Sequence, residues 1–167
     1  CRRYATDNRQ KRKGVNAMET KTKPQTTYLK DYQKPDYLIT KTHLDIAIHD
    51  GYTIVTGTLD IQKNHETSPQ HPLILHGENL ELISVKVDGD AIDAPEKEGE
   101  YLRLDLNTHT ATVETQVRIY PEKNFALEGL YKSDDIYCTQ NEPEGFRKIT
   151  YYLDRPDVMS RFTTRVR

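Results

Sequence analysis

Alternation of apolar and polar side chains with a period of two residues is the feature that most constrains this chain. Over residues 38–48 one face of an extended segment is apolar and the other is polar, which is the pattern of a half-buried β-strand. The apolar face carries Leu44, Ile46 and Ile48. Asp50-Gly51, typical of a two-residue hairpin turn, comes next, and the alternation then resumes to about residue 62. A β-hairpin is therefore predicted here.

The same pattern recurs as far as residue 119. Short strands are expected near residues 73–76 and 80–87, and Asp88-Gly89 marks another turn. Two further runs alternate in the same way: Leu102, Leu104 and Leu106, then Ala111, Val113, Val117 and Ile119. No stretch before residue 142 has a helical period of 3.6 residues. We therefore predict a mainly β fold, an antiparallel sheet of about seven strands that is saddle-shaped or sandwich-like.

The pattern changes after Pro121. From Glu122 to Gly145 the alternation is lost although apolar side chains persist, which predicts one long ordered loop that packs against something. The fold should also contain one or two short helices. Residues 154–157, Asp-Arg-Pro-Asp, are typical of a helix start, so we predict a short helix from there to about Arg161. An extended segment over 162–166 closes the sequence.

Composition argues against several classes of protein. With 24 Lys and Arg against 26 Asp and Glu, the net charge is −2, which disfavours a main role in binding nucleic acid. No apolar run approaches the roughly 20 residues of a membrane helix, so no membrane partner is expected. Cys1 and Cys138 make neither a disulfide framework nor a thiolate metal cluster. Since no export signal is visible, we expect a cytoplasmic location.

The first 17 residues differ in charge from the rest. Six Lys and Arg against Asp7 alone give this head +5, which leaves −7 for the other 150 residues. A head of this kind, without apolar periodicity, is expected to be disordered. Met18 begins a segment that looks like a translation start, so we interpret residues 1–17 as read-through of an untranslated region. An organelle transit peptide is the alternative, although the head contains no Ser. The domain is then expected over 18–167.

The sequence carries no complete active-site motif. The nearest match to the His-Glu-x-x-His zinc helix is residues 65–69, where Pro69 takes the second ligand position and would also break a helix. The Gly-x-Ser-x-Gly nucleophile motif and both common phosphate-binding glycine motifs are missing from the sequence. His65, His71 and His76 are therefore interpreted as loop and strand-edge histidines.

Gln140 and Glu142 are the one pair in the predicted loop whose chemistry points to binding. Two positions apart in an extended segment, their side chains point the same way, and Pro143 fixes the local backbone. An amide and a carboxylate aimed together can accept hydrogen bonds from an ammonium group. From the residues alone, a surface Glu142 in a polar loop is the simpler interpretation, and both remain open.

The C-terminal quarter of the sequence resembles the bacterial aminopeptidase N family of zinc metallopeptidases. The resemblance covers residues 24–167 and is densest from 125 onwards. It rests on the residues at 126–131, 138–140, 142, 144–147, 149–158 and 161–164. Upstream, Tyr28, Asp31-Tyr32, Pro35-Asp36-Tyr37 and Asn79-Leu80 also fit. One departure is that Asn141 and Pro143 flank Glu142 where relatives commonly carry Cys and Ala.

The resemblance implies a saddle-shaped N-terminal β-domain that lies against the catalytic domain of its own chain. Glu142 matches the glutamate that helps to hold the free α-ammonium group of a peptide substrate, and Gln140 matches a glutamine beside it. The family's zinc, which would activate a water molecule, is held by a His-Glu-x-x-His helix that this sequence lacks. We therefore expect zinc in the full-length enzyme, and expect this fragment alone to bind none and to be inactive.

Two other hypotheses for the function of this chain remain open. A free-standing β-sandwich that binds a partner without catalysis would need residues 125–137 to face that partner, and a related hydrolase with another task is also possible. The strand that ends the sequence indicates a domain truncated at its C-terminal end. We therefore expect the isolated chain to associate through this open edge and through apolar surface at 125–137.

Overall fold

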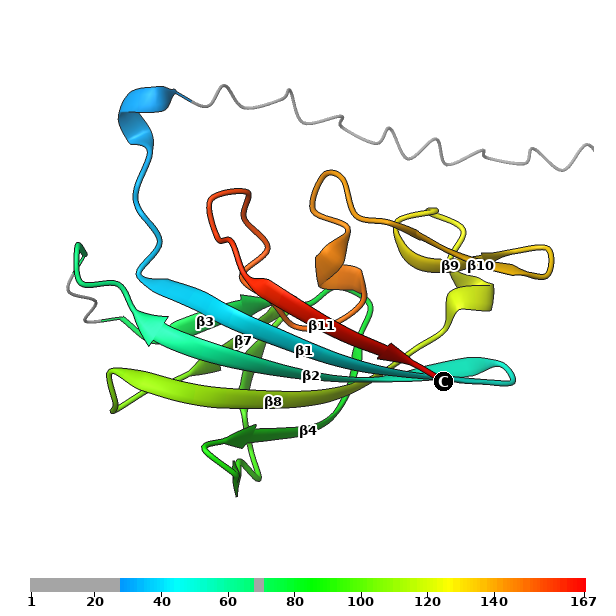
Figure 1. Ribbon diagram of the computed structural model, residues 1–167, viewed down its shortest axis with the longest axis horizontal. Helices are drawn as coiled ribbons and strands as arrows, with labels where there is room; N and C mark the ends of the chain where they lie inside the picture. Colours follow the sequence, from blue (N-terminus) through cyan, green and yellow to red (C-terminus); the bar gives the residue numbers. More distant parts are fainter. Residues whose placement is uncertain (1–27, 68–70) are drawn as a thin grey trace, which may run out of the picture. The chain divides into compact units, whose positions relative to one another are not determined.

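The computed structural model describes residues 28–67 and 71–167 (Figure 1). The expected head over residues 1–17 lies outside this part, and so does Pro69. The chain divides into two compact units, residues 1–32 and 33–167. The described part of the first unit contains one turn of 3₁₀-helix, η1 (Leu29–Asp31). In the described ranges no helix is long and apolar enough to cross a membrane.

The second unit is built on a six-stranded sheet with the strand order β11-β1-β2-β8-β4-β5. Its strands are β1 (Tyr37–His49), β2 (Tyr52–Lys63), β4 (Glu81–Val87), β5 (Asp90–Ala91), β8 (Thr110–Ile119) and β11 (Arg161–Val166). Both predicted hairpin turns form, since His49 pairs with Tyr52 across Asp50-Gly51 and Val87 pairs with Asp90. The period-two prediction is confirmed for β1, β2 and β8, in which alternate residues are buried.

Two smaller sheets accompany the large one. A three-stranded sheet has the order β3-β7-β6, with β3 (Leu73–His76), β6 (Glu96–Glu98) and β7 (Tyr101–Leu104). Figure 1 shows β3 and β7 behind the large sheet and a separate hairpin, β9 (Gly129–Ser133) with β10 (Ile136–Gln140), above the right-hand end of that sheet. Two 3₁₀ turns, η2 (Pro121–Lys123) and η3 (Phe146–Lys148), flank this hairpin in the sequence.

One hydrophobic core joins the large sheet to the small one. Alternate residues of β1, β2 and β8 are buried, while their neighbours on the other face, except Ala47, are partly or fully exposed. Core side chains with at most 4% exposure come from both sheets: Leu44, Val55, Leu59, Val113 and Val117 from the large one, Leu73, Leu75, Leu102 and Leu104 from the small one. Since two sheets share a core, the prediction of a mainly β, sandwich-like fold is confirmed.

A buried segment without regular secondary structure, residues 149–153, completes this core. Thr150 lies against both central strands, with its hydroxyl oxygen 3.5 Å from that of Thr115. Tyr152 exchanges two backbone hydrogen bonds with His76 of β3, of 2.8 and 3.0 Å. The segment therefore ties the large sheet to the small one, which its sequence does not indicate.

The predicted helix over 154–161 does not form. The carboxylate of Asp154 accepts hydrogen bonds from the backbone N–H and the Nε of Arg147, both at 3.1 Å. Asp157 accepts two hydrogen bonds from the guanidinium group of Arg155. The acids that would cap a helix are engaged in ion pairs instead, and only a turn remains at residues 156–157.

The long loop predicted over Glu122–Gly145 is ordered, but it is not a loop throughout. It contains the hairpin β9–β10, whose two-residue turn places Asp134 at a φ of 51°, a conformation that Asp tolerates better than most residues. The alternation that marks other strands is absent because only Gly129 and Leu130 of this hairpin are buried. A strand pair that buries so little leaves no period-two signal in its sequence.

The large sheet is antiparallel, as predicted, except at its β11 edge. β11 forms as an extended segment, as expected, but it pairs with β1 in parallel, from Lys41 with Arg161 to Ile46 with Val166. Parallel neighbours need a long crossover connection. The long connection from β1 to β11, through the rest of the sheet and residues 141–160, supplies it.

A substitution at Gly77 tests how tightly the buried segment at residues 149–153 is packed. A Cβ added at this position would lie 2.4 Å from the ring of Tyr151, which is fully buried, and 2.8 Å from Leu80. We expect Gly77→Ala to lower the free energy of unfolding by about 3 kcal/mol, because the ring has no room to move. Gly99→Ala is the control, since its site is open but has a φ of +58°, and should cost about 1 kcal/mol. Equal losses in chemical denaturation would contradict this account.

The buried position of His76 leads us to expect that the stability of the fold depends on pH. Burial lowers the pKa of His76, and the neighbouring Arg147 guanidinium lowers it further. The unfolded chain then binds a proton at a higher pH than the folded chain, so stability rises with pH up to about 6.5. We expect thermal melts to show a loss of stability as the pH falls below about 6.5, which His76→Gln reduces and His43→Gln, at an exposed site, does not. An unaltered pH profile in His76→Gln would refute this.

Candidate functional site

Gln140 and Glu142 lie at the point where the hairpin ends. Gln140 is the last residue of β10, and Glu142 begins the turn at residues 142–145. Both side chains are exposed. The extended run assumed from the sequence stops at Gln140, and the two residues are joined instead by a hydrogen bond in which the Gln140 Nε2 donates to the backbone oxygen of Glu142 at 3.1 Å.

The backbone closes tightly around Glu142. The N–H of Gly145 donates to the carbonyl of Asn141 at 3.0 Å, so residues 140–145 form a compact loop, called here the 140–145 turn. A Cβ added at Gly145 would lie 2.5 Å from the carbonyl oxygen of Gln140 and 2.9 Å from Cα of Asn141. Glycine is required at this position because backbone atoms occupy the space of a side chain.

The two carboxylates of the turn differ in their partners. Glu144 lies 3.4 Å from the guanidinium group of Arg147, which is itself held by Asp154. Within residues 28–67 and 71–167, Glu142 has no ion-pair partner. An exposed carboxylate without a counter-ion is available to a cation from outside, whereas the charge of Glu144 is partly neutralised.

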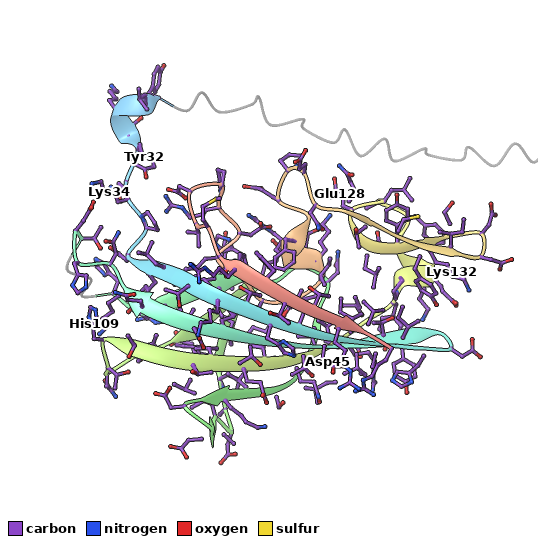
Figure 2. All side chains as sticks on the ribbon, viewed as in Figure 1. Tyr32, Lys34, Asp45, His109, Glu128 and Lys132 are labelled. Carbon is purple, nitrogen blue, oxygen red and sulfur yellow. The ribbon has the colours of Figure 1, made fainter. Side chains whose placement is uncertain are left out.

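Exposed apolar side chains surround the hairpin. Phe125 is 86% exposed, Leu127 53% and Ile136 67%. Figure 2 shows many side chains around this hairpin, with Lys132 of β9 and the preceding Glu128 labelled. As expected for residues 125–137, they present apolar surface of the kind that proteins cover with a partner.

Two residues that hold the β9–β10 hairpin in place, Asn124 and Lys148, could not be identified from the sequence. Asn124 donates from Nδ2 to the carbonyl oxygens of Glu128 at 2.6 Å and of Leu130 at 3.0 Å, and so fixes the start of β9. Lys148 forms ion pairs with Glu78 and Glu128. The partners of Lys148 lie 70 and 20 positions away, so only tertiary structure brings them together.

The histidines do not gather into a metal site. His65 stacks on His109 with ring centroids 4.4 Å apart, His71 precedes β3, and His76 ends that strand. In the described part of the chain no group of three or more His, Cys, Asp or Glu side chains is arranged to hold a metal ion. The residues present here therefore do not fit a catalytic zinc ion, which needs three protein ligands.

Comparison with known sequences gives a family match. Residues 18–167 match the profile of the family described as Peptidase M1 N-terminal domain. Aminopeptidase N of Escherichia coli (strain K12) is 42% identical over 143 residues, which are 86% of this chain and 16% of that protein. This chain therefore spans about a sixth of the length of that relative.

Comparison with solved structures gives the same fold. Legionella pneumophila aminopeptidase A, solved in complex with aspartic acid, has a TM-score of 0.76 at 24% identity and matches 84% of this chain and 17% of its own. The M1 zinc metallopeptidase from Deinococcus radiodurans has a TM-score of 0.64 at 16% identity, over 80% of this chain and 32% of its own. At sequence identities this low, the similarity to these two structures applies to the fold alone.

Gly145 provides a test of how the turn is built. We expect Gly145→Ala to move the backbone of Gln140 and Asn141, because its Cβ would meet these atoms. Amide NMR signals of Gln140, Asn141, Glu142 and Glu144 should shift while those of β2 and β8 stay. The free energy of unfolding should fall by about 1–3 kcal/mol. Gly51→Ala, with no atom within 4 Å of its Cβ, should leave residues 140–145 unaltered. Unmoved signals in Gly145→Ala would show that the turn is not closed by steric fit.

Proposed function

Because this chain belongs to the family of M1 peptidase N-terminal domains, we propose that it is the N-terminal domain of a zinc-dependent aminopeptidase. In this proposal the whole enzyme removes N-terminal residues from peptides. The domain contributes Glu142 and Gln140, which bind the free amino terminus of the substrate. The support for the activity is the identity to aminopeptidase N.

The observation that carries the site assignment is the exposed, unpaired carboxylate of Glu142 beside a fixed amide. The Gln140 amide nitrogen is used in the hydrogen bond to the carbonyl of Glu142, which leaves the amide oxygen free to accept. A carboxylate and an amide oxygen on one turn match an ammonium group, which has three donors and one positive charge. An N-acylated substrate lacks that charge and those donors, so the site selects free amino termini.

Catalysis is assigned to another part of the enzyme. The described residues offer no set of metal ligands, and the similar Deinococcus protein is named a zinc metallopeptidase. We propose that zinc is held by a catalytic domain of the same polypeptide, and that the exposed Phe125, Leu127 and Ile136 pack against it. The domain then measures the end of the substrate while its neighbour cleaves the first peptide bond. A cytoplasmic location remains part of the proposal.

A free-standing β-sandwich binding module is the second candidate, because the same apolar surface could meet another protein. The reading frame beyond Arg167 distinguishes the two. A His-Glu-x-x-His motif further along supports the aminopeptidase, and a stop codon directly after Arg167 supports the binding module.

The test of the site is Glu142→Ala in the intact enzyme. Loss of a charged hydrogen bond to the substrate ammonium should cost about 1.5–3 kcal/mol, which lowers kcat/KM on an aminoacyl arylamide by about ten- to a hundredfold, mainly through KM. The preference for free over N-acetylated substrates should fall as well. Glu144→Gln, which changes the neighbouring carboxylate that pairs with Arg147, is the control. Wild-type kinetics in Glu142→Ala would refute the assignment.

A further inference from the structure

We propose that Lys148 is a positioning residue for the substrate site and sets the position of Glu142. Its ammonium group holds Glu128, and with it the start of the strand that pairs with Gln140, against the segment whose backbone bonds to Gly145. This inference rests on the proposed function of Glu142. Lys148 does not touch the substrate in this account. It acts through the backbone of the turn.

Lys148 joins three segments that are distant in the sequence. Its Nζ lies 3.1 Å from the Oε1 of Glu78, which follows β3, and contacts the carboxylate of Glu128, which precedes β9. Lys148 itself ends η3. Figure 2 labels Glu128 where the hairpin meets the neighbouring segment. The Lys148 side chain is 12% exposed, against 27% for Glu78 and 47% for Glu128, so the cation is the most enclosed member of the cluster.

The backbone links this cluster to both ends of the turn. Gly129 pairs with Gln140 across the hairpin, and a Cβ added at Gly129 would lie 2.7 Å from the Cβ of Lys148. At the other end, the N–H of Lys148 donates to the carbonyl oxygen of Gly145 at 3.1 Å. Lys148 is thus in contact with Gly145 directly and with Gln140 through one residue. Glu142 lies between these two fixed points.

The positioning role of Lys148 depends on its positive charge more than on the volume of its side chain. The hydrogen bond to Glu128 raises the pKa of Lys148, and the bond to Glu78 adds to this, so the side chain stays protonated at neutral pH. Without the ammonium group, the carboxylates of Glu78 and Glu128 would face each other across a partly enclosed space. Leaving charges without their partner in such a space is unfavourable, and we expect the start of β9 to move away from η3.

Lys132 provides a matched control on the same hairpin. It lies on β9 and pairs with Glu122 at 2.9 Å, and that hydrogen bond raises its pKa as well. Lys132 is next to Ser133 and faces Tyr137 in the pairing of the strands, so it is near the tip of the hairpin. It holds an ion pair like that of Lys148 but does not contact the 140–145 turn.

The experiment compares Lys148→Met, Lys148→Arg, Lys132→Met and Glu142→Ala in the intact enzyme. Met keeps the length of the side chain and removes its charge. We expect Lys148→Met to raise KM for an aminoacyl arylamide about tenfold with kcat within about twofold, the pattern for lost substrate binding. Lys148→Arg should restore most of the affinity, and Lys132→Met should behave as wild type. In the 167-residue chain, the backbone amides of Asn141, Glu142, Glu144 and Gly145 should exchange faster in Lys148→Met than in Lys132→Met.

The outcomes separate this proposal from the proposed function. A wild-type KM in Lys148→Met together with a raised KM in Glu142→Ala would overturn the positioning role and leave the function intact. Equal rises in KM for Lys148→Met and Lys132→Met would overturn it too, since the effect would then be general loosening of the hairpin. A wild-type KM in Glu142→Ala defeats the proposed function itself, and amide exchange then still decides whether Lys148 holds the turn. Should Lys148→Met fail to fold, Glu128→Gln, which removes one counter-ion, is expected to raise KM less but in the same direction.

Discussion

The burial of one face of β1, β2 and β8 is the constraint on which the rest of this structure depends. That face is covered by β3 and β7 and by the irregular segment at 149–153. Tyr151 fills the space beside Gly77, and Thr150 fits against Gly57 of β2. These close approaches fix how the chain runs from the sandwich to its last strand. Because residues 146–148 lead directly into the buried segment, the support of the 140–145 turn is anchored in the core.

The hairpin β9–β10 stands in contrast to this core. It buries little of itself and is held by polar contacts, from Asn124 at its start and from Lys148 at its base. Such contacts are directional and set geometry, whereas apolar burial mainly sets stability. The fold therefore separates two tasks. A packed sandwich supplies stability, and a polar framework presents the turn that carries Glu142.

The long alternating segments were predictable because their periodicity records burial on one face. β1, β2, β4 and β8 form where the pattern places them. A turn forms at Asp50-Gly51, between β1 and β2, and at Asp88-Gly89, between β4 and β5, as expected. The segment 154–157 failed for the opposite reason. The acids that would cap this helix, Asp154 and Asp157, instead accept hydrogen bonds from Arg147 and Arg155. The helix-start pattern in the sequence does not reveal these ion pairs.

The β class, the positions of β1, β2, β4 and β8, and the candidate residues Gln140 and Glu142 follow from the sequence alone. Each of these depends on neighbours in the chain or on side-chain chemistry. Tertiary structure decided the parallel pairing of β11 with β1, the hairpin within the expected loop, and the enclosure of Lys148 between Glu78 and Glu128. These features depend on groups far apart in the sequence, and packing alone determines which of them meet.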